Sequence, residues 1–226
     1  MTTIPVSFWI ISLAFLGYFM ITWVSKLKQA HNLADGLADD KCLNLLIIKL
    51  VSGTVLFLLP FFFVSADLDF LLAPPRHFEN GIFVTAWLSL LLLIFYIAIN
   101  SAKKFKITRL QFPNQALNTA KSIQYMAVRL AFLFCYELYF RGVLLFTLLE
   151  YTPLVWAICI NSALYFIIHL FDSKQEIIGT LPFGIILCLI SYYTKSIWPA
   201  FIMHAMLAGI YESTLIFYKP SKTSGP

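Results

Sequence analysis

The run Ile82-Phe-Val-Thr-Ala-Trp-Leu-Ser-Leu-Leu-Leu-Leu-Ile-Phe-Tyr-Ile-Ala-Ile-Asn100 contains no charged residue. A membrane-crossing helix needs about 20 mainly apolar residues, and this run meets that length. Two apolar runs precede it and four follow it: Val6–Val24, Leu45–Val64, Ile123–Tyr151, Pro153–Phe171, Ile177–Tyr193 and Ile197–Tyr218. The sequence therefore predicts an all-α, polytopic transmembrane helix bundle of about seven spans.

The composition of the chain excludes most other classes of protein. Hydrophobic residues make up 60% of the 226 positions and charged residues 12%, against about 45–50% and about 25% in soluble domains. The net charge of +5 does not indicate nucleic acid, because Lys and Arg gather in short loops between the apolar runs. The basic loops 26–44 and 101–122 are predicted to lie in the cytoplasm, with the N-terminus outside.

The spans differ in where they carry polar groups. Residues 1–119 supply three N-terminal spans that are almost purely apolar inside, whereas residues 120–218 supply four spans with nearly every ionisable residue at membrane depth. A charge near the bilayer centre costs roughly 3 kcal/mol, so such residues need a partner or a function. We expect one integrated membrane domain whose functional core is the second part.

Glu137, Arg141, His169 and His204 are the polar residues that most need an explanation. Glu137 and Arg141 are four positions apart and share a helical face, where they can form an ion pair. At a rise of 1.5 Å per residue, Glu137 and the two histidines each lie within roughly 10 Å of mid-span. The fourth, fifth and seventh spans are therefore expected to bring them into one buried pocket.

Two chemistries fit these residues, beside a purely structural role. Glu137 can accept a proton from water while one histidine positions it and the other stabilises an oxyanion. Alternatively, the glutamate and both histidines can bind Zn²⁺. In the structural alternative, the Glu137–Arg141 pair tethers helices and His169 forms an interhelical hydrogen bond on a face shared with Tyr165 and Asn161.

Three segments in the second half of the chain have the form of known motifs. They are Tyr136-Glu-Leu-Tyr-Phe-Arg-Gly142, Tyr165-Phe-Ile-Ile-His169, and Ser196-Ile-Trp-Pro-Ala200 running on to His204. Their order and spacing resemble the CAAX-protease and bacteriocin-processing family of intramembrane proteases, also called CPBP or Abi. The resemblance covers roughly residues 120–212.

The family's motifs read Glu-Glu-x-x-x-Arg, Phe-x-x-x-His and His-x-x-x-Asn, and this chain departs from them in places. Tyr136 stands at the first Glu, Glu137 matches the second, and Ala208 stands at the Asn. The resemblance implies a glutamic-type endopeptidase that needs no metal. By resemblance, His169 helps a motif-one glutamate to activate water, and His204 holds the oxyanion.

We therefore predict an intramembrane endopeptidase that hydrolyses a peptide bond of a membrane-associated protein or peptide by glutamate- and histidine-activated water. The expected partners are that substrate and the lipid bilayer, without nucleic acid. No cofactor is expected, with Zn²⁺ as the alternative. The expected catalytic residues are Glu137, His169 and His204, with support from Arg141, Tyr136, Tyr165 and Asn161.

Two other classes of function stay open. A catalytically inactive CPBP-like protein that binds and regulates a membrane partner is favoured by Tyr136 and Ala208. A transporter or proton relay is less favoured, because the chain has no visible internal repeat. The compact loops are typical of a multi-pass protein of a bacterial inner membrane.

Overall fold

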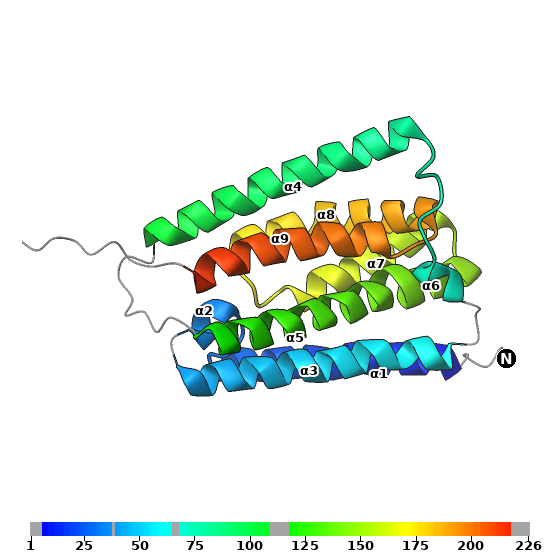
Figure 1. Ribbon diagram of the computed structural model, residues 1–226. Helices are drawn as coiled ribbons and strands as arrows, with labels where there is room; N and C mark the ends of the chain where they lie inside the picture. The colour runs from blue at the N-terminus through cyan, green and yellow to red at the C-terminus, as the bar shows by residue number, and fades with distance from the viewer. Residues whose placement is uncertain (1–5, 38, 65–67, 109–117, 218–226) are drawn as a thin grey trace, which may run out of the picture.

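The computed structural model of the protein describes residues 6–37, 39–64, 68–108 and 118–217, and each regular element in these ranges is a helix (Figure 1). The elements are α1 (Val6–Leu27), α2 (Leu33–Gly36), α3 (Asp40–Phe63), the short 3₁₀ helix η1 (Asp69–Leu72), α4 (Gly81–Thr108), α5 (Thr119–Glu137), the π-helical segment η3 (Leu138–Leu144), α6 (Leu145–Tyr151), α7 (Leu154–Ile168), α8 (Lys174–Thr194) and α9 (Trp198–Ile216).

Six helical stretches in the described part of the chain are long and apolar enough to cross a membrane. One of them, Thr119–Tyr151, runs without a break through α5, η3 and α6. The seventh predicted run corresponds to α7, which has 15 residues and is shorter than the usual span. The prediction of an all-α transmembrane bundle of about seven spans is confirmed, and the chain is an integral, multi-pass membrane protein.

The stretch α5–α6 is the centre of the bundle. In its most apolar stretch of 18 residues, 83% is buried inside the bundle, whereas the buried share of the corresponding stretch of α4 is 11%. Figure 1 shows α1 and α3 on one side of α5, with α9 and then α4 on the other. Side chains of the N-terminal and C-terminal helices share one hydrophobic core. The polar residues of α5 and η3 are therefore enclosed by helices from both halves of the chain.

Gly53 allows α1, α3 and α5 to approach closely. A Cβ atom at this position would lie 2.5 Å from Cε2 of Tyr18 and 2.6 Å from Cε2 of Phe132. Both rings also pack against Phe57, and the rings of Phe57 and Tyr136 meet edge to face at 5.3 Å. The absence of a side chain at Gly53 thus fixes the aromatic layer on which Tyr136 rests.

Three helices end and two others begin at one end of the bundle. Figure 1 shows the ends of α1, α4 and α9 on the left, together with the starts of α3 and α5. The two basic loops that predict a cytoplasmic face, 26–44 and 101–122, connect helices at this end, although residues 38 and 109–117 of those loops lie outside the described part. The predicted orientation places this end in the cytoplasm.

Candidate active site

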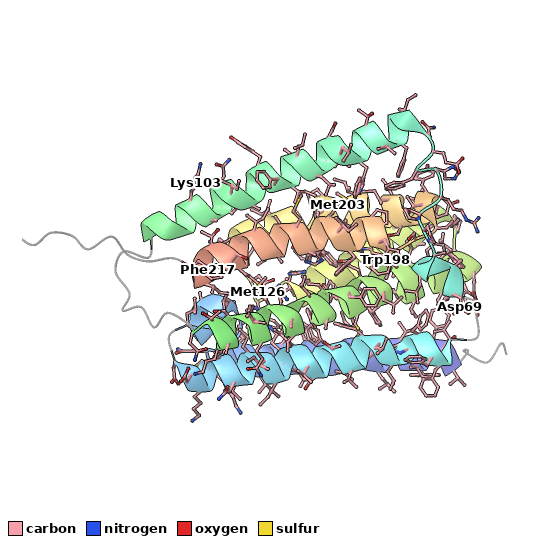
Figure 2. All side chains as sticks on the ribbon, viewed as in Figure 1. Asp69, Lys103, Met126, Trp198, Met203 and Phe217 are labelled. Carbon is pink, nitrogen blue, oxygen red and sulfur yellow. The ribbon has the colours of Figure 1, made fainter. Side chains whose placement is uncertain are left out.

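Glu137 is the last residue of α5 and is fully buried. Its Oε1 lies 2.5 Å from Nδ1 of His204, which α9 supplies from the facing side of the bundle. Its Oε2 lies 3.2 Å from Nε of Arg141. Figure 2 labels Met203 on α9, directly before His204. The structure thus brings together the first and third motifs through one carboxylate.

Arg141 forms the predicted pair with Glu137, but it does so from a π-helical backbone. The helix widens over Leu138–Leu144, where backbone N–H groups bond five residues back instead of four. Arg141 Nη1 donates to Oδ1 of Asn161 at 2.6 Å, and Asn161 Nδ2 donates to the Phe140 carbonyl oxygen at 2.6 Å. Such π segments are often found at functional sites, and this one overlaps the first motif, Tyr136–Gly142.

The guanidinium of Arg141 is held on its other side by an aromatic ring. Its Cζ lies 4.4 Å from the ring centroid of Tyr165, within the range of a cation–π contact. A buried charge is tolerated when it is paired and hydrogen-bonded. Arg141 is paired with Glu137 and donates through Nη1 to Asn161, while its Nη2 has no hydrogen-bond partner and the Tyr165 ring lies against the guanidinium. Asn161 and Tyr165 therefore contact Arg141 from α7, as supporting residues of the buried pair.

Tyr136 stands between the two histidines. Its hydroxyl lies 3.2 Å from Nε2 of His169, and its ring centroid lies 5.8 Å from that of His204. The ring of Tyr165 also lies against both imidazoles, with its centroid 4.9 Å from that of His169 and 6.5 Å from that of His204. Because Tyr136 occupies the first Glu position of the motif, a phenol meets His169 where the family pattern has a carboxylate.

His169 is the residue directly after α7 rather than a residue inside a span. Its Nδ1 lies 2.5 Å from Oδ2 of Asp172, three positions further along the chain. The other carboxylate oxygen, Oδ1, lies 2.5 Å from Nε2 of His31. The three sequence motifs include neither Asp172 nor His31. The i,i+3 spacing of His169 and Asp172 is a visible signal, whereas nothing local in the sequence points to His31.

Asp172 fixes the proton pattern of His169. Burial opposes ionisation of its carboxyl group, but the hydrogen bonds from His169 and His31 outweigh it and hold the pKa of Asp172 below its ordinary value. An ionised carboxylate only accepts hydrogen bonds, so Nδ1 of His169 carries the hydrogen. Nε2 of neutral His169 then bears a lone pair and accepts from the Tyr136 hydroxyl. His169 is arranged as a base backed by a carboxylate.

The candidate site therefore contains two carboxylate–histidine pairs, Glu137–His204 and Asp172–His169, on either side of Tyr136, and His31 is a further partner of Asp172. Glu137 contacts His204 directly, and the rings of Tyr136 and Tyr165 lie between the imidazoles of His204 and His169. The sequence predicts all three catalytic side chains in one pocket. The contacts divide them between two pairs that share aromatic neighbours.

The third motif region is anchored on η1. The indole N–H of Trp198 donates to the Leu72 carbonyl oxygen at 2.9 Å, and the Ser196 hydroxyl donates to the Ala73 carbonyl oxygen at 2.9 Å. These bonds fix the start of α9 and hence the position of His204 along the bundle. Ala208 follows His204 by one turn on the same helix and packs against the hydrophobic core.

The residues present do not fit the zinc alternative. In the described part of the chain, no three His, Cys, Asp or Glu side chains are grouped so that they could hold a metal ion. Nδ1 of His204 and Oε1 of Glu137 face each other, and both ring nitrogens of His169 have other partners. These atoms bond to protein groups rather than converging on an ion.

The part of the chain that holds these residues matches a known family model. The model described as type II CAAX prenyl endopeptidase Rce1-like matches residues 118–210, from the start of α5 into α9. The chain contains an Rce1-like domain. The match is consistent with the CPBP family that the three motifs resemble, and it supports a CAAX-protease-type membrane protein. No curated protein and no solved structure matches the chain.

The Rce1-like domain includes both carboxylate–histidine pairs. Glu137, His169, Asp172 and His204 all lie between residues 118 and 210. A partly buried ion pair lies at the edge of the match, where Arg129 Nε donates to Oε1 of Glu212 at 2.9 Å. His31 lies outside the match, although it contacts Asp172 directly.

Proposed function

We propose that the protein is an intramembrane endopeptidase that hydrolyses a peptide bond of a membrane-associated protein or peptide. The observation that carries this proposal is the presence of two carboxylate–histidine pairs beside one tyrosine in an Rce1-like domain. In this proposal His169 activates water, and His204 stabilises the oxyanion. No metal takes part. The compact connections between spans favour a bacterial inner membrane as the location.

His169 is the proposed general base. Its side chain is 22% exposed, whereas that of Glu137 is fully buried, so water reaches His169 more readily. Nε2 takes a proton from water as the hydroxide oxygen bonds to the substrate carbonyl carbon, and Asp172 stabilises the imidazolium that forms. The Tyr136 hydroxyl lies 3.2 Å from Nε2, so the Tyr136 side chain has to shift to admit that water, and its hydroxyl can then donate to the water or to the substrate.

His204 is the proposed oxyanion donor, with Glu137 as its positioning residue. Nε2 can donate only if it carries hydrogen, so the Glu137–His204 pair must hold two protons, one on Nε2 and one between Nδ1 and Oε1. Arg141 balances the negative charge of Glu137. When the C–N bond breaks, the proton held by His169 passes to the amine nitrogen, which restores the base.

The test compares protein termini in membranes of cells that express the wild type, His169→Ala or His204→Ala. The matched control is His77→Asn, because His77 is exposed in a loop and Asn tolerates its positive φ of 65°. We expect new peptide ends in the wild type and in the control, and their loss in the two alanine variants at equal protein levels. Identical termini in all four strains would show that these histidines do not catalyse cleavage.

A second candidate function rests on Tyr136. Its hydroxyl occupies Nε2 of His169, and the first motif Glu is missing, which favours an inactive relative that binds and regulates a membrane protein. The variant Tyr136→Glu separates the two candidates. If the wild type yields no new termini but Tyr136→Glu does, the natural chain is the inactive relative.

A further inference from the structure

His31 is held firmly although it lies in the connection between α1 and α2. Its backbone N–H donates to Oδ2 of Asp35 at 3.0 Å. Asp35 and Asn32 also form a capping box at the start of α2, in which each side chain accepts from the backbone of the other. The side chain of His31 is 3% exposed. This short segment therefore presents one buried imidazole at a fixed place.

The imidazole of His31 bridges Lys49 and Asp172. Nε2 lies 2.5 Å from Oδ1 of Asp172, and Nδ1 lies 3.3 Å from Nζ of Lys49. Nζ also donates to the His31 carbonyl oxygen at 2.8 Å, and Lys49 is buried on α3. Phe171 packs its ring against those of Phe19 and His31, which holds the turn that carries Asp172. Helices α1, α2 and α3 thus all contribute to the position of this carboxylate.

The hydrogen bonds from Lys49 through His31 to Asp172 all donate in the same direction. An ammonium group has three donors and no acceptor, so Nδ1 of His31 accepts from Lys49 and Nε2 of His31 carries the hydrogen. Nε2 then donates to Asp172, which also accepts from Nδ1 of His169. Because both oxygens of Asp172 are engaged, the carboxylate cannot rotate away from His169 without losing a bond. The lone pair of His169 is thereby kept on Nε2.

We propose that His31 and Lys49 are positioning residues for His169, that they act through Asp172, and that the N-terminal helices complete a functional site of which the Rce1-like domain holds only part. The consequence for catalysis rests on the proposed function. The effect on Asp172 and His169 does not, and it can be measured in an inactive protein.

The experiment uses the full chain, labelled with ¹⁵N in the histidine rings and placed in lipid nanodiscs. The Nδ1 signal of His169 reports its bond to Asp172 as the pH is lowered from 6 to 2. Asp172 faces His31 from the α1–α2 connection, His169 from its own turn and, beyond His31, Lys49 from α3. Loss of one hydrogen bond to this carboxylate moves the transition to higher pH by about 1–2 units.

Two variants of His31 separate the donor from the ring. His31→Phe keeps a ring against Phe171 but has no donor, and it is expected to show the upward shift. His31→Gln has no ring but places an N–H near the position of Nε2, and it is expected to restore the wild-type transition. If the folded Phe variant titrates like the wild type, or if the Gln variant behaves like the Phe variant, the proposal is wrong.

Lys49→Met is an independent variant in case His31→Phe does not fold. Without the ammonium, Nδ1 of His31 is free to carry hydrogen, so a protonated Nδ1 signal of His31 is expected. An Nδ1 that stays wholly unprotonated would overturn the role of Lys49. Where hydrolysis is measurable, His31→Phe is expected to lower kcat by about 10–100-fold with KM unchanged, as for other partners that orient a functional histidine. Absence of hydrolysis in the wild type would count against the proposed function alone.

Discussion

Replacement of Gly53 by alanine tests the close packing of α1, α3 and α5. The added Cβ would lie 2.5 Å from Tyr18 and 2.6 Å from Phe132, whereas carbon atoms in contact lie about 3.5–4.0 Å apart. The helices or rings would have to move by about 1 Å. Overpacking of this kind costs about 1–3 kcal/mol, and rigid aromatic rings on two helices favour the upper end. Alanine regains about 1 kcal/mol of helix propensity, so we expect a net loss of about 1–2 kcal/mol.

The control is Gly209→Ala in α9, where an added Cβ meets no atom within 4 Å. This variant gains the same helix propensity without a clash, so we expect it to be more stable than the wild type by about 1 kcal/mol. The assay is unfolding of the purified protein in mixed detergent and SDS micelles, followed by circular dichroism. Unfolding of Gly53→Ala at the same SDS fraction as Gly209→Ala would contradict the predicted clash at position 53.

Two further predictions concern polar groups. Glu212→Gln removes the carboxylate that pairs with Arg129 and accepts from Tyr125, so we expect a loss of about 1–3 kcal/mol in the same SDS titration, and an unchanged midpoint would contradict this pairing. The lowered pKa of Asp172 means that its ionised form stabilises the fold at pH values above about 4 and that this contribution is lost as the pH falls through the lowered value. Asp172→Asn should therefore be less stable than the wild type at pH 6, with a difference that shrinks towards pH 2, and a constant difference would count against the ionised pair.

The helices could be predicted from the sequence because a bilayer leaves the backbone few choices. Unsatisfied N–H and C=O groups are costly in lipid, so each long apolar run becomes a helix. The run Ile123–Tyr151 did form one continuous span, but its π-helical part, Leu138–Leu144, could not be predicted. Its sequence, Leu-Tyr-Phe-Arg-Gly-Val-Leu, contains no proline and has no pattern that separates a π helix from an α helix.

The candidate site could be predicted only in part. Glu137 and Arg141 pair as their spacing indicated, and the motif positions pointed to His169 and His204. The partner of each histidine depends on tertiary structure. Nδ1 of His204 faces Glu137 across the bundle, and Asp172 meets His31 from a position 141 residues away in sequence. Contacts of that range leave no periodic signal in a single sequence.

The most direct test of the account is whether His169 directs the addition of water to a peptide bond. Purified full-length protein in nanodiscs would be mixed with the membrane proteins of cells that lack it, in water enriched in ¹⁸O, and new C-termini would be read by mass spectrometry. We predict C-termini that carry one ¹⁸O atom with the wild type and His77→Asn, and their loss with His169→Ala. The same labelled termini with the wild type and His169→Ala, or none with either, would contradict the account.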